Sequence, residues 1–82
     1  MQQTHTITLT DLAQNARAVI RSFMVGRHEA SRLASLGLTP GAEVNMTQNL
    51  GRGPLIITVR GTRVALGRRE AAKIYVERSL AE

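Results

Sequence analysis

One ten-residue stretch, from Leu33 to Ala42, most constrains what this 82-residue chain can fold into. Its sequence, Leu-Ala-Ser-Leu-Gly-Leu-Thr-Pro-Gly-Ala, combines a helix end, a turn and a strand start. Gly37 stands where a left-handed residue commonly ends a helix, because glycine has no Cβ to clash there. Leu38 would then fold back onto Leu33, as in other caps of this kind. The stretch therefore predicts an abrupt change of chain direction.

The second half of this stretch predicts a tight turn. Residues 39–42 fit a type II turn, because proline presets φ at the second position and glycine supplies the positive φ of the third. We expect these residues to be architectural rather than functional. The structural motif residues are Leu36, Gly37, Leu38, Pro40, Gly41 and, in a later turn, Gly61.

Alternating apolar and polar residues predict short strands along the rest of the chain. The candidate strands begin at Ile7 and cover residues 16–22, 43–48, 55–60, 63–66 and 74–76. A helix is expected over 27–36, with Ala30, Leu33 and Ala34 on one apolar face, and a helical turn over 68–73. Glycine or proline interrupts nearly every connection. The pattern predicts a mainly β, strongly bent antiparallel barrel of five to six strands, one domain over 1–82 with frayed ends at 1–6 and 79–82.

Three local features add detail to this expectation. Thr10 or Asp11 is expected to cap a short turn through 12–13, and Asn15 is expected in the left-handed conformation. Residues 61–62 fit a two-residue hairpin turn of type II′. Closing the hairpin there places Arg60 opposite Arg63. Two facing arginines either splay into water or hold an anion or an acidic partner between them.

The chain carries a formal net charge of +5, and ten of its eleven basic residues are arginine. Arginine prefers planar partners such as carboxylate and phosphate, so nucleic acid, anionic lipid and an acidic protein surface are all compatible. An ordinary solvated surface explains the same charge. With only two aromatic residues, a base-stacking platform is not expected. Basic residues late in the sequence form the candidate partner-binding set: Arg52, Arg60, Arg63, Arg68, Arg69 and Lys73.

The sequence does not predict an enzyme, a metal site or a cofactor. There is no cysteine, and no serine lies in a nucleophile-elbow pattern. The candidate ligands do not recur at helical spacing: His5, Asp11, His28, Glu29, Glu43, Glu70 and Glu77. The longest apolar runs are three residues, whereas a membrane helix needs about 20. No signal-peptide pattern opens the chain, and we expect a cytoplasmic protein.

Two sequence blocks resemble the FeoA family, named after ferrous-iron transport protein A. The first runs from Arg32 to Val44, and the second runs from Gly53 to Val76 with the Val-Arg-Gly-Thr turn at its centre. The likeness spans residues 7–77, although 14–15 replace a frequent Pro-Gly and Gly67 replaces a frequent basic residue. It implies an SH3-like β-barrel with an inserted helix. It also implies a cytosolic accessory protein of bacterial ferrous-iron uptake that contacts FeoB, the membrane transporter whose cytosolic part is a GTPase, without iron chemistry of its own.

Two other function classes stay open at the level of sequence. One is a small basic nucleic-acid-binding barrel. The other is a metal-sensing regulatory module, because the same SH3-like unit also ends repressors of the diphtheria-toxin-repressor type. Self-association through exposed strand edges and a position close to the membrane also stay open.

Overall fold

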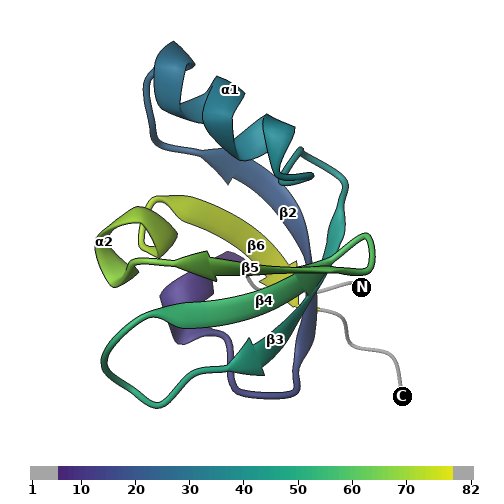
Figure 1. The fold of residues 1–82 in the computed structure, drawn as a ribbon, viewed down its shortest axis with the longest axis vertical. Coiled ribbons are helices and arrows are strands. Elements are labelled where there is room, and N and C mark those ends of the chain that lie inside the picture. The colour runs from purple at the N-terminus through teal and green to yellow at the C-terminus, as the bar shows by residue number, and fades with distance from the viewer. Residues whose placement is uncertain (1–5, 79–82) are drawn as a thin grey trace.

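A computed structural model describes residues 6–78, so the predictions for residues 1–5 and 79–82, including His5, lie outside the described residues. The strands are β1 (Thr6–Thr8), β2 (Arg17–Phe23), β3 (Glu43–Gln48), β4 (Leu55–Val59), β5 (Thr62–Leu66) and β6 (Ile74–Arg78). The helices are the 3-10 helix η1 (Leu9–Asp11), α1 (Arg27–Ser35) and α2 (Arg68–Ala71) (Figure 1). Thr6, expected in a frayed end, is the first residue of β1 and lies opposite Glu77.

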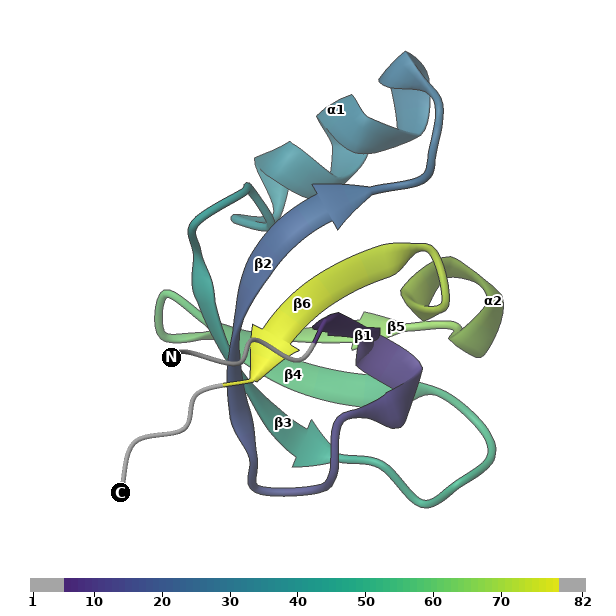
Figure 2. The same ribbon diagram turned by 180° about the vertical axis from the view of Figure 1, so that it is seen from behind.

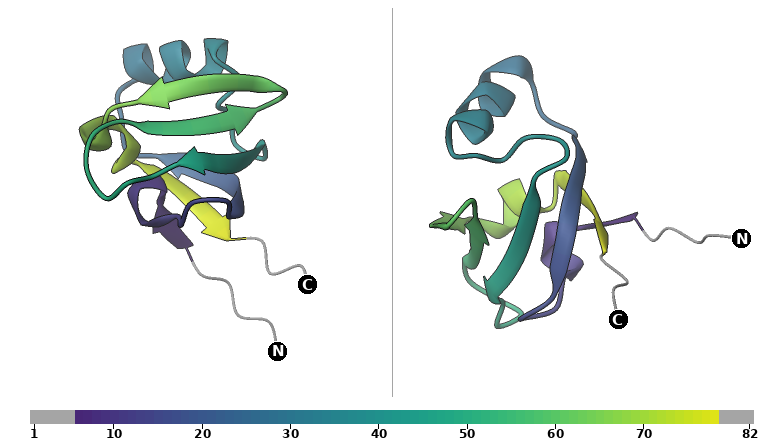
Figure 3. Two further views of the ribbon diagram at one scale, coloured as in Figure 1. Left: turned by 60° about the horizontal axis from the view of Figure 1, so that its bottom comes forward. Right: turned by 90° about the vertical axis from the view of Figure 1, so that its right-hand side faces the viewer.

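The six strands form one antiparallel sheet in the order β1-β6-β2-β3-β4-β5. Strand β2 bends through the molecule and pairs with β3 near its start and with β6 along its length (Figure 2). The register shifts between Ile20 and Ser22 and between Met46 and Gln48, and such bulges increase the bend of a strand. The mainly β fold and its strong curvature are therefore confirmed. Helix α1 stands at one end of the molecule, beyond the strands (Figure 3), and contacts the core through Leu33.

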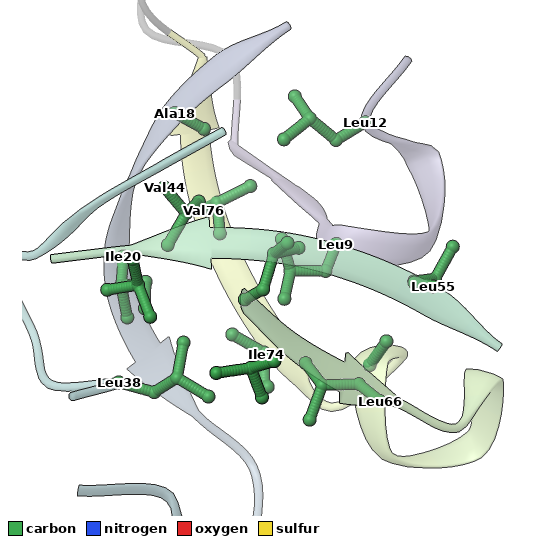
Figure 4. Packing of buried hydrophobic residues seen from close by; sticks show 14 of the residues in the cluster. Leu9, Leu12, Ala18, Ile20, Leu38, Val44, Leu55, Leu66, Ile74 and Val76 are labelled. Carbon is green, nitrogen blue, oxygen red and sulfur yellow. The ribbon is translucent and has the colours of Figure 1, made fainter. Parts of the chain in front are cut away.

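The core lies inside the curved sheet and consists of apolar side chains alone, since no polar residue between 6 and 78 is buried. Ile20, Val44 and Ile57 are fully buried on β2, β3 and β4. Leu9 and Leu12, from η1 and the residue after it, are buried in the same cluster (Figure 4). Helix α1 contributes only Leu33 as a fully buried residue. The predicted apolar face of this helix is narrower than expected: Ala30 is half-buried and Ala34 is exposed.

The stretch from Leu33 to Ala42 folds as predicted. The amides of Gly37 and Leu38 donate to the carbonyls of Ala34 (2.9 Å) and Leu33 (3.0 Å), which is the bond pair of a Schellman cap. Gly37 has φ +93°, and both Leu33 and Leu38 are fully buried. Ala42 donates to Thr39 across the turn (3.0 Å), and Gly41 also has φ +93°. Leu36, one of the motif residues, is the C-cap of α1 and is exposed.

The predicted hairpin register is wrong, because the turn lies one residue earlier than the expected residues 61–62. The turn residues are Arg60 and Gly61, with φ of +52° and +78°, the pattern of a type I′ turn. Val59 consequently lies opposite Thr62, and Arg63 lies opposite Thr58 rather than Arg60. Both registers keep inward residues opposite inward residues, so the apolar alternation does not distinguish them.

Smaller differences occur at element ends. Thr8, not Thr10 or Asp11, precedes the first helical turn, and its amide and hydroxyl both donate to the Asp11 carboxylate (3.4 and 3.2 Å). Asn15 has φ +74°, as expected. Helix α2 ends at Ala71, before the predicted end at residue 73, and β6 extends to Arg78, beyond the predicted end at residue 76.

Candidate protein-binding surface

The structure divides the predicted partner-binding residues between the two ends of the β4–β5 hairpin. Arg60 lies in the turn, and Arg63 is the second residue of β5. Arg52 precedes β4, while Arg68, Arg69 and Lys73 follow β5 around α2. Strand β5 has five residues, so the two groups lie about 17 Å apart along the strand. Figure 1 shows the turn at one side of the molecule and α2 at the other.

All six of these cations lack an ion pair within residues 6–78, whereas three of the five other arginines are paired. Arg17 pairs with Glu43 (3.8 Å) and Arg21 with Glu77 (3.4 Å). The third pair joins Arg32 on α1 to Glu70 on α2. No ion pair within residues 6–78 therefore competes with a partner for the six predicted cations.

Arg68 differs from the other five, because its side chain is used inside the molecule. Its Nη2 donates to Oδ1 of Asn49, in the loop between β3 and β4. The residue is half-buried, and its Nε is buried without a hydrogen-bond partner among residues 6–78. The other five are exposed. Arg68 therefore fastens α2 to the loop and is a poor candidate for contact with a partner.

Asn49 is a key residue that the sequence analysis missed. Its Nδ2 donates to the carbonyls of Thr10 (3.3 Å) and Leu12 (2.9 Å), and its Oδ1 also accepts from the amide of Gly51 (3.1 Å). Its own amide donates to Oε1 of Gln14 (3.0 Å). The Asn-x-Gly pattern typical of an Asx turn is the one sequence signal for this role.

A shallow pocket of about 370 Å³ lies beside the hairpin turn. Its lining residues come from the turn after α1 and from β3, β4 and the hairpin turn: Gly41, Ala42, Glu43, Asn45, Thr58, Arg60 and Gly61. The stem of Arg60 crosses the α1 cap, with Cδ 3.4 Å from the point that a Cβ on Gly37 would occupy. This pocket brings a cation, an amide and a hydroxyl side chain to one place.

A second hollow of about 620 Å³ runs along α1, lined by His28, Glu29, Ser31, Arg32 and Ser35. It lies on one helix and does not bring a nucleophile together with residues from another element. Within residues 6–78, no three His, Asp or Glu side chains gather closely enough to hold a metal ion. No helix in that range has the length and apolar character to cross a membrane.

Comparison with known proteins decides the family. The sequence model of the FeoA domain matches residues 7–78. The chain belongs to the FeoA domain family. A protein of Methanocaldococcus jannaschii, provisionally named Fe(2+) transport protein A, is 31% identical over 64 residues, which is 78% of this chain and 77% of that protein.

Solved structures agree on the family and the fold. The crystal structure of an iron uptake regulatory protein, FeoA, superposes with a TM-score of 0.86 at 28% identity, over 92% of this chain and all of that one. Stenotrophomonas maltophilia FeoA, crystallised with zinc and described as a prokaryotic SH3 domain protein, is 33% identical with a TM-score of 0.74, over 85% of this chain and 88% of its own. The SH3-like fold is thereby confirmed. The crystal structure of T. acidophilum IdeR shares the fold alone, at 19% identity and a TM-score of 0.81 over 96% of this chain and 37% of that chain.

Proposed function

We propose that this chain is a cytoplasmic accessory protein of bacterial ferrous-iron uptake, which acts by contact with the cytosolic GTPase domain of the iron transporter FeoB. The single observation that carries the proposal is the FeoA match, which covers residues 7–78 and so nearly all of the described chain. The M. jannaschii relative carries an iron-transport name, and a transport-activating role has been suggested for the S. maltophilia protein.

The surface chemistry supports contact with an acidic protein. Five exposed cations without an ion pair within residues 6–78 lie on the β4–β5 hairpin and the segments that flank it. Opposite charges across an interface raise the rate of association and fix its register more than they raise affinity. We infer an accessory role by contact rather than by catalysis, because the pockets are open and the candidate ligands are scattered.

The contact is testable by capture of the FeoB cytosolic domain on the immobilised chain. The natural chain is expected to retain the domain at low salt, and Arg60→Glu with Arg63→Glu is expected to weaken capture tenfold or more, since each reversal replaces attraction by repulsion. The matched control is Arg27→Glu with Arg78→Glu, which changes the net charge equally at sites outside the hairpin. Equal capture by both double variants would remove the hairpin as the contact site, and no capture by the natural chain would contradict the proposal.

The nucleic-acid alternative has a separate test. Binding through phosphate contacts would weaken steeply with salt, because each contact releases a counterion. We expect the chain to cause no gel shift of generic DNA or RNA at about 50 mM salt. Binding there that collapses as salt rises would favour the nucleic-acid function instead.

A further inference from the structure

Arg60 occupies a backbone conformation that disfavours its side chain. Its φ of +52° lies in the left-handed region, where asparagine, aspartate and glycine are the residues usually found in a type I′ turn. The only other non-glycine residue with positive φ between residues 6 and 78 is Asn15, a type that tolerates it. Backbone strain of this kind persists where the surrounding structure enforces it, and it concentrates at functional sites.

The structure directs the Arg60 side chain to one place. Its stem lies across Gly37, with Cδ 3.4 Å and Nε 3.8 Å from the position of an added Cβ. Its guanidinium makes no ion pair or side-chain hydrogen bond within the described chain. An arginine whose stem is held against the backbone loses less entropy when its planar head binds a partner.

The pocket beside Arg60 offers further donors. Asn45 and Thr58 are opposite one another on β3 and β4, and both line the pocket. The Thr58 hydroxyl lies 2.8 Å from that of Thr47; either hydroxyl can donate this bond, and when Thr47 donates, the Thr58 proton is free for a ligand. Arg63 faces Thr58 from β5 and extends the same row. The one acidic side chain of the lining, Glu43, is paired with Arg17 at 3.8 Å.

From this geometry we propose that the pocket is a carboxylate-binding site, in which Arg60 holds an aspartate or glutamate side chain of the partner protein. Asn45 and Thr58 supply the second set of hydrogen bonds. The inference rests on the proposed function, because the partner is the FeoB cytosolic domain, and it deepens it by naming the contact. The charge and geometry of the site carry it: within residues 6–78 the Arg60 guanidinium has no ion pair, its stem is held against the α1 cap, and its planar head fits a carboxylate with two parallel bonds.

The decisive variant is Arg60→Asn, because relief of the backbone strain should raise the stability of the chain whereas loss of the contact should lower its affinity for the partner. Asparagine suits the left-handed turn position, so the melting temperature of the chain should rise by about 2–5 °C. Affinity for the FeoB cytosolic domain should fall tenfold or more, since the charged fork is lost. Arg60→Lys keeps the charge without the fork and should lose affinity by an intermediate factor. Misfolding does not explain a loss of binding in a variant that is more stable.

The control is Arg27→Asn, which removes the same charge at the other end of α1 and should leave affinity within twofold. Binding of Arg60→Asn as tight as that of the natural chain overturns the carboxylate site while the proposed function stands. No binding by the natural chain overturns both. Inorganic phosphate at about 10 mM should not raise the melting temperature of the natural chain. A rise that Arg60→Asn abolishes would assign the pocket to a free anion and overturn the protein-contact proposal.

Discussion

Asn49 shows how one half-buried side chain holds three segments of this fold together. Its Nδ2 donates to the carbonyls of Thr10 within η1 and of Leu12 just after it, its Oδ1 accepts from Gly51, and Arg68 brings in α2. These bonds replace the apolar packing that a loop of small and polar residues does not supply. At residue scale, the β3–β4 loop is therefore fixed by polar contacts and not by burial.

Asn49→Ala is expected to lower the free energy of unfolding by about 2 kcal/mol, because several hydrogen bonds are lost and the Arg68 head loses its acceptor. Urea titration followed by circular dichroism measures the change. Asn45→Ala is the matched control, since Asn45 is exposed on β3 and makes no side-chain hydrogen bond in the described structure. Equal stability losses in the two variants would show that the Asn49 network contributes nothing.

Roles of this kind are beyond what the sequence predicts. An asparagine near glycine indicates a turn, but its partners Thr10 and Leu12 lie 39 and 37 positions away. The sequence predicts Arg68 as a partner-binding residue for the same reason, since nothing local distinguishes an arginine that bonds inward. Gly37 and Gly41 were predictable, because the demand for positive φ is set by their immediate neighbours.

At element scale, α1 is stabilised by the caps at its two ends more than by the side chains it buries. Only Leu33 is fully buried, and the pair between Arg32 and Glu70 joins the helix to α2. The N-cap is Gly26, with φ −72° and ψ +172°, and it makes no side-chain cap bond. The other end is the Schellman cap at Gly37. A nine-residue helix with one buried residue depends on such caps.

The same substitution at these two glycines should therefore have opposite effects. Gly26→Ser gives α1 a hydroxyl acceptor in an extended conformation that serine adopts, and it should stabilise the chain by about 0.5–1 kcal/mol. Gly37→Ser should destabilise it by about 1 kcal/mol because of φ +93°. The added Cβ at Gly37 meets Arg60 at 3.4 Å, an ordinary contact, so conformation and not collision sets the cost. Thermal unfolding of both variants checks the signs, and effects of equal sign would contradict these cap assignments.

Elements were more predictable than their pairing. The helix over 27–36 and the strands over 43–48 and 55–60 were placed within a residue of their observed ends, because period and punctuation are local signals. The hairpin register was not, because glycine was expected at the first turn position and Arg60 occupies it instead. A strained arginine there is a departure from local preference, and it coincides with the pocket for which we infer a function.

At the scale of the whole molecule, the curved sheet separates residues that are close in sequence. Arg63 and Arg68 are five positions apart, yet they lie near opposite ends of β5 and play different parts. The sequence predicted the SH3-like fold and the basic character of the hairpin. It did not predict that the basic residues form two groups, since that depends on where the hairpin turns. The turn end, with Arg60, Arg63 and the pocket, is the group best placed for a partner.

The most direct test of the account is calorimetric titration of the natural chain into the isolated FeoB cytosolic domain at about 50 and about 300 mM salt. The account predicts a one-to-one complex with a dissociation constant on the order of micromolar at the lower salt, as for a small transient interface. Affinity should fall several-fold at the higher salt, because exposed charges are screened. No heat of binding at the lower salt, or an affinity that does not change with salt, would contradict it.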